Sequence, residues 1–444
     1  MSLIIEESNL NGVEVYYNQS AGLMRAVDEL QKQYRDGTLD IVNLQSYSTN
    51  GHTDCPIWYE IQSYTTKRWT PVVDQCKFYT SHYIGRFSFN GYSIIINPRY
   101  GNIFSYLISY ATNLYLPLGS SNLEYNTTSN SYWLIALIWK ALLNKALTFG
   151  QIPREYKTVQ KNQKHFKGHL NISKHIHSNL CNASRFFCSY KKLSMDNAIN
   201  QTIRAVYKVL KGKGVGTIIG EFEAYDKYLE SMGVGSIDNV NQIESIKYTR
   251  LNDAYRPVMR LSKTILSNQK AQSVDGGQNS DISYFIDIAE LWEIYLLRLL
   301  QNNLPSEYKV FSPNSLRGES LLDNDMREIR PDILISKNGV VEMVIDAKYK
   351  HYNNFGATST FGIQREDLYQ MTTYLYHYGE ENRNIVGIFT APIECCDNDI
   401  HTYRNNRNHK IGLVNLDITK DSIESIHLAE KKYIETIINL LGSN

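Results

Sequence analysis

The sequence of 444 residues has only six cysteines, and they form no pattern typical of a metal site or a redox motif. None belongs to a C-x-x-C pair, and two of them, Cys395 and Cys396, are adjacent. Adjacent cysteines are poorly placed to share a disulfide or a tetrahedral metal. A chain of this length can bury a large core without covalent links. We therefore expect neither a zinc site nor a disulfide framework.

Long apolar runs, a secretion signal and a nucleotide-binding loop are also absent. The most apolar stretch, residues 133–147, is interrupted by Lys140 and Asn144 and is too short to cross a bilayer. The N-terminus lacks the basic start and apolar run of a signal peptide. The stretch Lys211-Gly212-Lys213-Gly214 lacks the Ser or Thr and the spacing of a phosphate-binding loop. These absences predict a cytoplasmic protein that contacts no membrane and contains no nucleotide-driven motor of its own.

A strong excess of charge of one sign is missing as well, since the net charge is +1. Its distribution is uneven, however: residues 151–213 hold 13 Lys and Arg against 2 acidic residues, a difference of +11, which leaves −10 for the remainder. Such a block attracts phosphate groups. The alternative is a solvated face whose lysines scatter over several helices. The residues that we expect to contact DNA are Lys161, Lys164, Lys167, Lys174, Lys191 and Lys192.

Three regions that differ in composition and in the pattern of apolar residues predict a multidomain α+β protein. Residues 1–119 alternate apolar and polar positions in short runs, which predicts a β-rich domain with a hairpin that turns at Asn90-Gly91. Residues 120–275 indicate a mainly helical, basic domain that contacts a partner or DNA. It ends in a Gln-, Ser- and Gly-rich stretch, residues 267–280, which is typical of a linker.

The third region, residues 281–444, predicts an α/β domain with a mixed sheet flanked by helices. A strong helix is expected first, then a hairpin of two β-branched strands with an Asn-Gly turn, then a helix and a buried strand. The predicted elements are the helices 282–300 and 366–378 and the strands 326–336, 340–348 and 385–390.

Three charged residues on the predicted hairpin could carry chemistry. Asp346 and Lys348 are two positions apart near the end of a strand, so their side chains project from the same face. Asp332 follows Pro331 on the preceding strand, and the hairpin can bring it alongside them. Two neighbouring carboxylates bind a hard divalent cation, and a lysine can orient a water molecule or stabilise charge on a phosphate. The alternative is a set of charged residues at the rim of a sheet.

Four sequence segments around these residues resemble McrC, the nuclease subunit of the McrBC modification-dependent restriction systems. The resemblance extends upstream to about Ser120, and a weaker one covers the β-rich N-terminal region. The segments are FIDIAELWEIYL (285–296), IRPDILI (329–335), VIDAKYK (344–350) and REDLYQMTTYLYHY (365–378).

This resemblance implies a PD-(D/E)xK endonuclease-like domain that uses Mg²⁺, with Mn²⁺ as a possible substitute. Asp332 and Asp346 would bind the metal and Lys348 would be the catalytic lysine. Glu293 falls where the superfamily often places a further glutamate near the metal, although an exposed helix glutamate is the alternative. Gln370 and Tyr374 fall where it often supports the site or the DNA, and a packed helix with polar edges is the alternative.

The resemblance also implies a partner, McrB, a GTP-hydrolysing AAA+ protein whose hexameric ring receives the N-terminal part of McrC. The sequence therefore predicts the endonuclease subunit of a motor-driven restriction complex that cleaves double-stranded DNA. Two alternatives stay open. One is a non-cleaving regulatory adaptor that stimulates an AAA+ NTPase, and the other is a stand-alone DNA repair nuclease.

Overall fold

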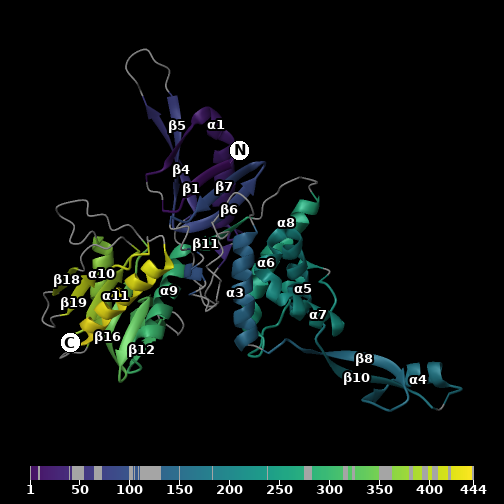
Figure 1. Ribbon diagram of the computed structural model, residues 1–444. Helices are drawn as coiled ribbons and strands as arrows, with labels where there is room; N and C mark the ends of the chain where they lie inside the picture. Colours follow the sequence, from purple (N-terminus) through teal and green to yellow (C-terminus); the bar gives the residue numbers. More distant parts are fainter. Residues whose placement is uncertain are drawn as a thin grey trace. The chain divides into compact units, whose positions relative to one another are not determined.

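The protein is a multidomain α+β chain, as predicted, and it divides into two units (Figure 1). Unit 1 combines Met1–Ser129 with Ser280–Asn444, and unit 2 is Asn130–Asn279. In the part of the chain that the structure describes, no helix combines the length and the apolar character needed to span a bilayer. The computed structural model describes residues 2–8, 11–39, 41–42, 55–64, 73–99, 104, 106–108, 110, 132–149, 151–182, 184–237, 239–274, 283–313, 319–322, 326–349, 363–379, 384–392, 399–402, 409–418 and 422–442.

The first sheet of unit 1 contains strands from both ends of the chain. Its order is β1-β7-β6-β11-β3, and β11 comes from far along the sequence. Gly85 lies where β6 pairs with β11, and a Cβ atom there would come within 2.1 Å of the Tyr284 carbonyl oxygen. Only glycine permits this approach. The strands are β1 (Ser2–Glu6), β3 (Ile41–Val42), β6 (Tyr83–Phe89), β7 (Tyr92–Asn97) and β11 (Tyr284–Asp287).

A second sheet of unit 1 has the order β2-β5-β4 and shares a helix and a core with the first. The predicted hairpin turn at Asn90-Gly91 is confirmed, because it joins β6 to β7. The boundaries 1–119 and 281–444 stay predictions, and the pairing of β11 with β6 couples these two regions. The elements are β2 (Val13–Tyr16), β4 (Ile57–Tyr64), β5 (Val73–Thr80) and α1 (Tyr17–Arg35).

The third sheet of unit 1 is mixed, as predicted, in the order β12-β15-β16-β17-β19-β18. The β15–β16 pair is antiparallel, whereas β16, β17 and β19 are parallel. Helix α10 packs against β16 and β17, and α9 packs against β12, β16 and α11 (Figure 1). The elements are β12 (Tyr308–Phe311), β15 (Ile333–Lys337), β16 (Val340–Ala347), β17 (Val386–Thr390), β18 (Asp399–Thr402), β19 (Lys410–Leu413), α9 (Ile288–Asn303), α10 (Arg365–Tyr378) and α11 (Ile423–Gly442).

Two predictions about this region are wrong in detail. The helix expected from residue 282 begins at Ile288, because Asp287 caps it by accepting hydrogen bonds from the backbone N–H groups of Ala289 and Glu290. The strand expected over 326–336 is interrupted before Asp332. Its first part, β14 (Met326–Ile329), pairs with β13 (Glu319–Leu322) rather than with the main sheet.

The body of unit 2 is helical, as predicted. Its two longest helices, α3 and α8, pack against each other, and the indole of Trp139 donates a buried hydrogen bond of 3.0 Å to Ser262. The linker expected over 267–280 is wrong in its first half, because α8 continues to Val274, and the rest lies outside the described residues. The elements are α3 (Trp133–Phe149), α5 (Ala198–Leu210), η1 (Lys211–Val215), α6 (Gly216–Ile219), η2 (Gly220–Phe222), α7 (Glu223–Ser231), η3 (Val240–Ile243), η4 (Asp253–Tyr255) and α8 (Arg256–Val274).

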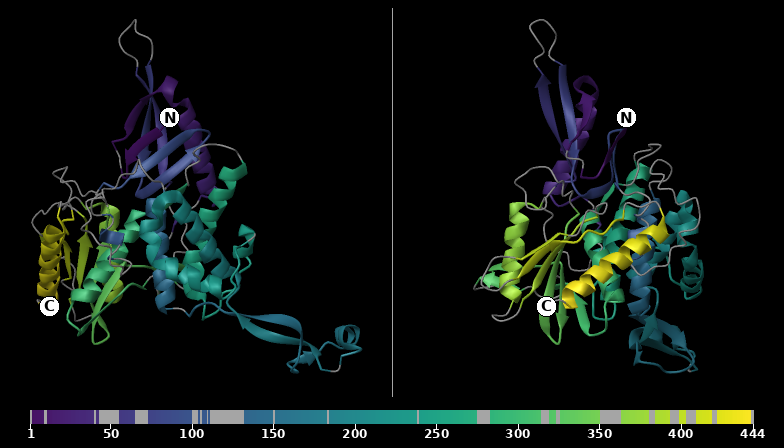
Figure 2. Two further views of the ribbon diagram at one scale, coloured as in Figure 1. Left: turned by 45° about the vertical axis from the view of Figure 1, so that its right-hand side comes forward. Right: turned by 60° about the vertical axis from the view of Figure 1, so that its left-hand side comes forward.

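Residues 155–194 correct the prediction that the basic region is mainly helical. They form a three-stranded sheet and one short helix, which together project from the helices of unit 2 (Figures 1 and 2). We call this segment the arm. The strands β8 and β10 pair along nine positions, so the backbone hydrogen bonds of the arm are local. The elements are β8 (Glu155–Gln163), β9 (His169–Leu170), α4 (Ile172–Asn179) and β10 (Phe186–Ser194).

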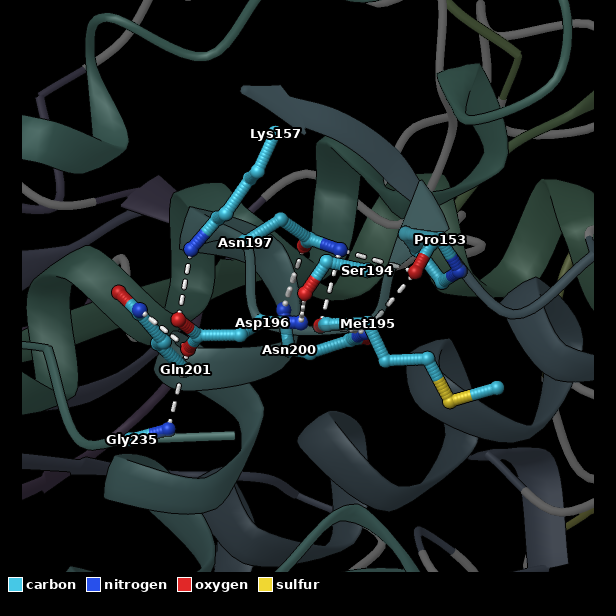
Figure 3. A network of polar contacts seen from close by, with 9 residues as sticks. All are labelled: Pro153, Lys157, Ser194, Met195, Asp196, Asn197, Asn200, Gln201 and Gly235. Carbon is cyan, nitrogen blue, oxygen red and sulfur yellow. Dashed lines mark hydrogen bonds and ion pairs between the residues drawn. The ribbon is translucent and has the colours of Figure 1, made fainter. Parts of the chain in front are cut away.

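A buried network fastens both ends of the arm to the start of α5 (Figure 3). The side-chain amides of Asn197 and Asn200 each donate hydrogen bonds to the carbonyl oxygens of Pro153, before β8, and Met195, after β10. Beside them, Lys157 forms an ion pair of 2.6 Å with Asp196. The arm is therefore held at its base by side chains of the helical body.

Candidate active site

The end of β16 presents two of the predicted site residues on one face of the sheet. Val344 and Asp346 share a face because they are two positions apart, and Val344 packs in the core that α10 covers. Asp346 is 2% exposed. Lys348 follows the last strand residue and continues the same alternation. Both charged side chains therefore lie on the side of the sheet that faces α10.

Asp332 lies beside the end of β16, just before β15. Its Oδ2 atom accepts a hydrogen bond of 2.7 Å from the backbone N–H of Ala347. This bond ties the Asp332 carboxylate to the residue between Asp346 and Lys348. The register of β15 against β16, with Ile333 opposite Ile345, produces this approach. The structure thus brings the three predicted residues together.

The ammonium group of Lys348 lies among two carboxylates and an amide. It is 2.8 Å from Asp346 Oδ2 and 3.3 Å from Asp367 Oδ1, and it donates a hydrogen bond of 3.3 Å to Gln370 Oε1. The Lys348 side chain is 14% exposed. Among the described residues, no group donates a further hydrogen bond to the buried Oδ2 atom of Asp346. Lys348 is therefore held in one place by groups from two elements.

Helix α10 supports this arrangement through the two residues that the resemblance indicated. Gln370 donates a hydrogen bond of 2.7 Å to the hydroxyl of Tyr374, which donates one of 3.0 Å to the carbonyl oxygen of Arg330. Gln370 and Tyr374 thus connect Lys348 to the backbone two residues before Asp332. These contacts place both side chains beside the candidate site, and a role for them in supporting it stays a prediction.

Glu293, on α9, is partly buried and close enough to the two aspartates to interact with them electrostatically. Burial raises the pKa of Glu293 well above its usual range, and the charges of Asp332 and Asp346 raise it further. Among the described residues, however, no three His, Cys, Asp or Glu side chains are grouped so that they could hold a metal ion. A role for Glu293 as a metal ligand stays a prediction.

Electrostatics at the site reflect this crowding of charge. Burial raises the pKa of Asp332, and the neighbouring charge of Asp346 raises it further. Burial alone would lower the pKa of Lys348, but the charges of Asp346 and Asp332 outweigh it, so the pKa of Lys348 is raised. Two carboxylates that repel each other favour a bound cation, and Lys348 supplies only one positive charge.

Asp367 is a further candidate site residue, which the sequence interpretation missed. It is 7% exposed and lies 3.3 Å from the Lys348 ammonium group. Asp367, Gln370 and Tyr374 are spaced three and four residues apart, so they share one face of α10. The spacing alone was a weak signal in the sequence, because the burial of Asp367 against Lys348 depends on how α10 packs on the sheet.

The six lysines predicted to contact DNA are exposed and all belong to the arm. The register of β8 with β10 places Lys192 opposite Lys157 and Lys191 opposite Thr158, so consecutive lysines point to opposite faces. On one face Lys167 lies over the Tyr190 ring, and on the other Lys174 donates a hydrogen bond to Gln160. The lysines therefore occupy both faces of the arm.

Two chains of solved structures are similar to this protein over most of its length. The fold is similar to a chain of the refined half-complex from the tetradecameric assembly of Thermococcus gammatolerans McrB AAA+ hexamers with bound McrC, with a TM-score of 0.54 and 18% identity, over 99% of this chain and 100% of that one. A chain of the Thermococcus gammatolerans McrBC complex matches with a TM-score of 0.38 and 18% identity, over 69% of this chain and 89% of that one.

No curated protein matches the sequence. A family model does: it is described as McrBC 5-methylcytosine restriction system component, and it matches residues 79–389. This match runs from the end of β5 through Asp332, Asp346, Lys348 and α10 to β17. The resemblance drawn from the sequence segments is thereby confirmed, and the chain belongs to the McrBC 5-methylcytosine restriction system component family.

Proposed function

We propose that this chain is the DNA endonuclease subunit of a motor-driven restriction complex and that its C-terminal region is a PD-(D/E)xK domain. The observation that carries the proposal is the convergence of Asp332, Asp346 and Lys348 at the end of β16. The buried carboxylate of Asp346 and the partly buried one of Asp332, beside a held ammonium group, suit hydrolysis of a phosphodiester. A regulatory adaptor would have no need of this arrangement.

The donor set fits a divalent cation such as Mg²⁺, with Mn²⁺ as a substitute. Mg²⁺ in proteins is usually bound by one or two carboxylates and completes its shell with water and phosphate oxygens. Asp332 and Asp346 supply two carboxylates whose mutual repulsion a cation would relieve. When bound, such a metal lowers the pKa of a coordinated water molecule and offsets charge on the phosphate.

The chain's own residues would then bind and orient the DNA phosphate. Lys348 places a fixed positive charge beside the two aspartates, where negative charge develops during attack on phosphorus. Asp367 and Gln370 hold the ammonium group so that little reorganisation is needed during the reaction. Tyr374 supports Gln370 in turn. Each group acts through a position that packing and hydrogen bonds already fix.

The proposed partner is an AAA+ GTPase ring similar to McrB. The support comes from the solved relative, which was determined as McrB AAA+ hexamers with bound McrC. Double-stranded DNA is the proposed substrate, and the exposed lysines of the arm are the proposed backbone contacts. Neutralisation of phosphates by lysines would make this contact strongly dependent on salt.

The proposal is tested by cleavage of plasmid DNA with the chain and its AAA+ partner. EDTA should abolish cleavage, and added Mg²⁺ or Mn²⁺ should restore it. Asp346→Ala should remove cleavage, whereas Glu342→Gln, which alters another buried acid of the same strand, should not. Cleavage that persists in EDTA, or equal loss in both variants, would refute a metal site at Asp346.

A further inference from the structure

Glu7, Arg99 and Tyr349 form a buried cluster that joins the N-terminal sheet to the end of β16. Glu7 follows β1 and Arg99 follows β7, and these strands pair in parallel. The backbone N–H of Arg99 donates to Glu7 Oε2, and its Nε atom lies 3.1 Å from Glu7 Oε1. The Tyr349 hydroxyl donates a hydrogen bond of 3.1 Å to the same Oε1 atom. Glu7 is fully buried and Tyr349 is 4% exposed.

Arg99 also holds the backbone and the ring of Tyr349. Its Nη2 atom donates a hydrogen bond of 3.2 Å to the Tyr349 carbonyl oxygen. Its guanidinium carbon lies 5.1 Å from the centre of the Tyr349 ring, within the range of a cation–π contact. Residue 349 is therefore fixed through its hydroxyl, its ring and its carbonyl group.

Tyr349 is the residue after Lys348, so these contacts bear on the lysine. The pairing of β16 with β17 ends at Ala347, and beyond it the backbone N–H of Lys348 donates one more hydrogen bond of 2.9 Å, to the Thr390 carbonyl oxygen. The indole of Trp292 donates to the same carbonyl oxygen and lies beside the Tyr349 ring. Thr390 thus holds the backbone N–H of Lys348, and Glu7 and Arg99 hold the residue that follows it.

We propose that Glu7 and Arg99 are positioning residues for Lys348. By fixing Tyr349, they hold the backbone of Lys348 so that its ammonium group lies beside the two aspartates. The N-terminal sheet then completes the cleavage site without contacting DNA or metal. A displacement of about 1 Å at a reacting group can lower a rate by about a hundredfold. Loss of the contacts that Glu7 and Arg99 make with Tyr349 therefore has a measurable effect. This inference rests on the proposed nuclease function.

The experiment uses the full-length chain with its AAA+ partner, Mg²⁺ and plasmid DNA, and it measures the cleavage rate constant at saturating DNA and the KM for DNA. Arg99→Ala should lower the rate constant at least about tenfold with KM within about twofold, because positioning acts on the reacting groups rather than on DNA binding. Arg99→Lys keeps the charge beside Glu7 and should recover part of the rate.

A matched pair of variants separates positioning from stability. Tyr349→Phe and Tyr106→Phe each remove one hydroxyl that donates to a buried glutamate, Glu7 in the first case and Glu430 in the second. Tyr349→Phe should lower the rate constant, and Tyr106→Phe should lower only the free energy of unfolding. If Arg99→Ala fails to fold, this pair decides the matter.

Two outcomes overturn the inference. In the first, the parental chain cleaves and the folded Arg99→Ala or Tyr349→Phe protein cleaves at the same rate, which leaves the proposed function intact and gives the cluster a role in stability only. In the second, the parental chain does not cleave, which removes the proposed function and this inference together.

Discussion

The site around Lys348 and the arm both carry lysines, but they expose them to very different degrees. At the site, the Lys348 side chain is 14% exposed and the Asp346 side chain 3%. On the arm, the lysines are exposed and spread over two faces of a hairpin. Charges in a buried cluster interact strongly, whereas exposed charges are screened by water and salt. Under the proposed function, burial separates a site at which single groups control cleavage from a surface on which many lysines share the contact with DNA.

The largest expected effect concerns Lys348, the buried lysine of the site. Lys348→Met keeps an unbranched side chain of similar length but removes the charge beside Asp346. The cleavage rate constant should fall by about a hundredfold or more, as for loss of one group that stabilises developing charge. Lys309→Met, on β12 outside the site, is the control. A Lys348→Met protein with the parental rate would remove the distinction between the two regions.

A second prediction concerns the pH dependence of stability at Glu7. Burial raises its pKa to about 7 from 4.5, although the charge of Arg99 lowers it. A raised carboxyl pKa means that the folded state binds the proton more tightly, so this contribution is complete below pH 4.5 and is lost as the pH rises through about 7. The contribution of Glu7 to the free energy of unfolding changes with pH by roughly 3 kcal/mol at most.

Urea unfolding of the parental chain and of Glu7→Gln at several pH values measures this contribution. The free energy of unfolding of the parental chain should fall relative to that of Glu7→Gln between about pH 5 and 7.5. Parallel profiles for the two proteins would contradict the raised pKa.

A smaller effect is expected at the base of the arm. Asn200→Ala removes hydrogen bonds to the carbonyl oxygens of Pro153 and Met195. The free energy of unfolding of the unit that contains the arm should fall by about 2 kcal/mol, since buried polar groups lose partners. Asn241→Ala, at an exposed position of the same unit, is the control. Equal unfolding curves for the two variants would mean that the base is not held by Asn200.

The smallest effect per residue is expected on the arm itself. Replacing Lys161, Lys164 and Lys167 by Gln should reduce the salt dependence of DNA binding by about 0.9 in slope for each phosphate that is no longer neutralised. Lys247→Gln, outside the arm, should leave the slope unchanged. The measurement is DNA affinity over a series of salt concentrations. A slope that the triple variant does not change would assign these lysines to a solvated face.

The sequence predicted the convergence of Asp332, Asp346 and Lys348 better than it predicted the residues around them. Strand alternation and the Asn338-Gly339 turn depend on neighbouring residues, so the approach of Asp332 to Asp346 and Lys348 followed from local rules. Asp367 was missed because its role depends on how α10 packs on the sheet. The Glu7–Arg99–Tyr349 cluster joins residues more than 200 positions apart, which no local pattern can indicate.

In the arm, local sequence patterns did not predict the strands that the structure has. The strand β8 is mainly polar on both faces, with Lys157 and Lys161 on one and Thr158 and Gln160 on the other, so neither a helical nor a strand period stands out in it. The start of α9 was misplaced because β11 is an apolar strand that precedes an apolar helix without a break. Only the Asp287 cap, three residues before Glu290, indicated the boundary.

The central claim is that this chain supplies the cleavage site and that an AAA+ partner supplies the motor. The most direct test reconstitutes the complex with Asp346→Ala and measures plasmid cleavage and phosphate release in the same reaction. The account predicts that cleavage is abolished while nucleotide hydrolysis stays within about twofold of the parental rate, because the variant deletes a charge at the site and no docking surface. Cleavage at the parental rate in Mg²⁺ would contradict the account in favour of the adaptor.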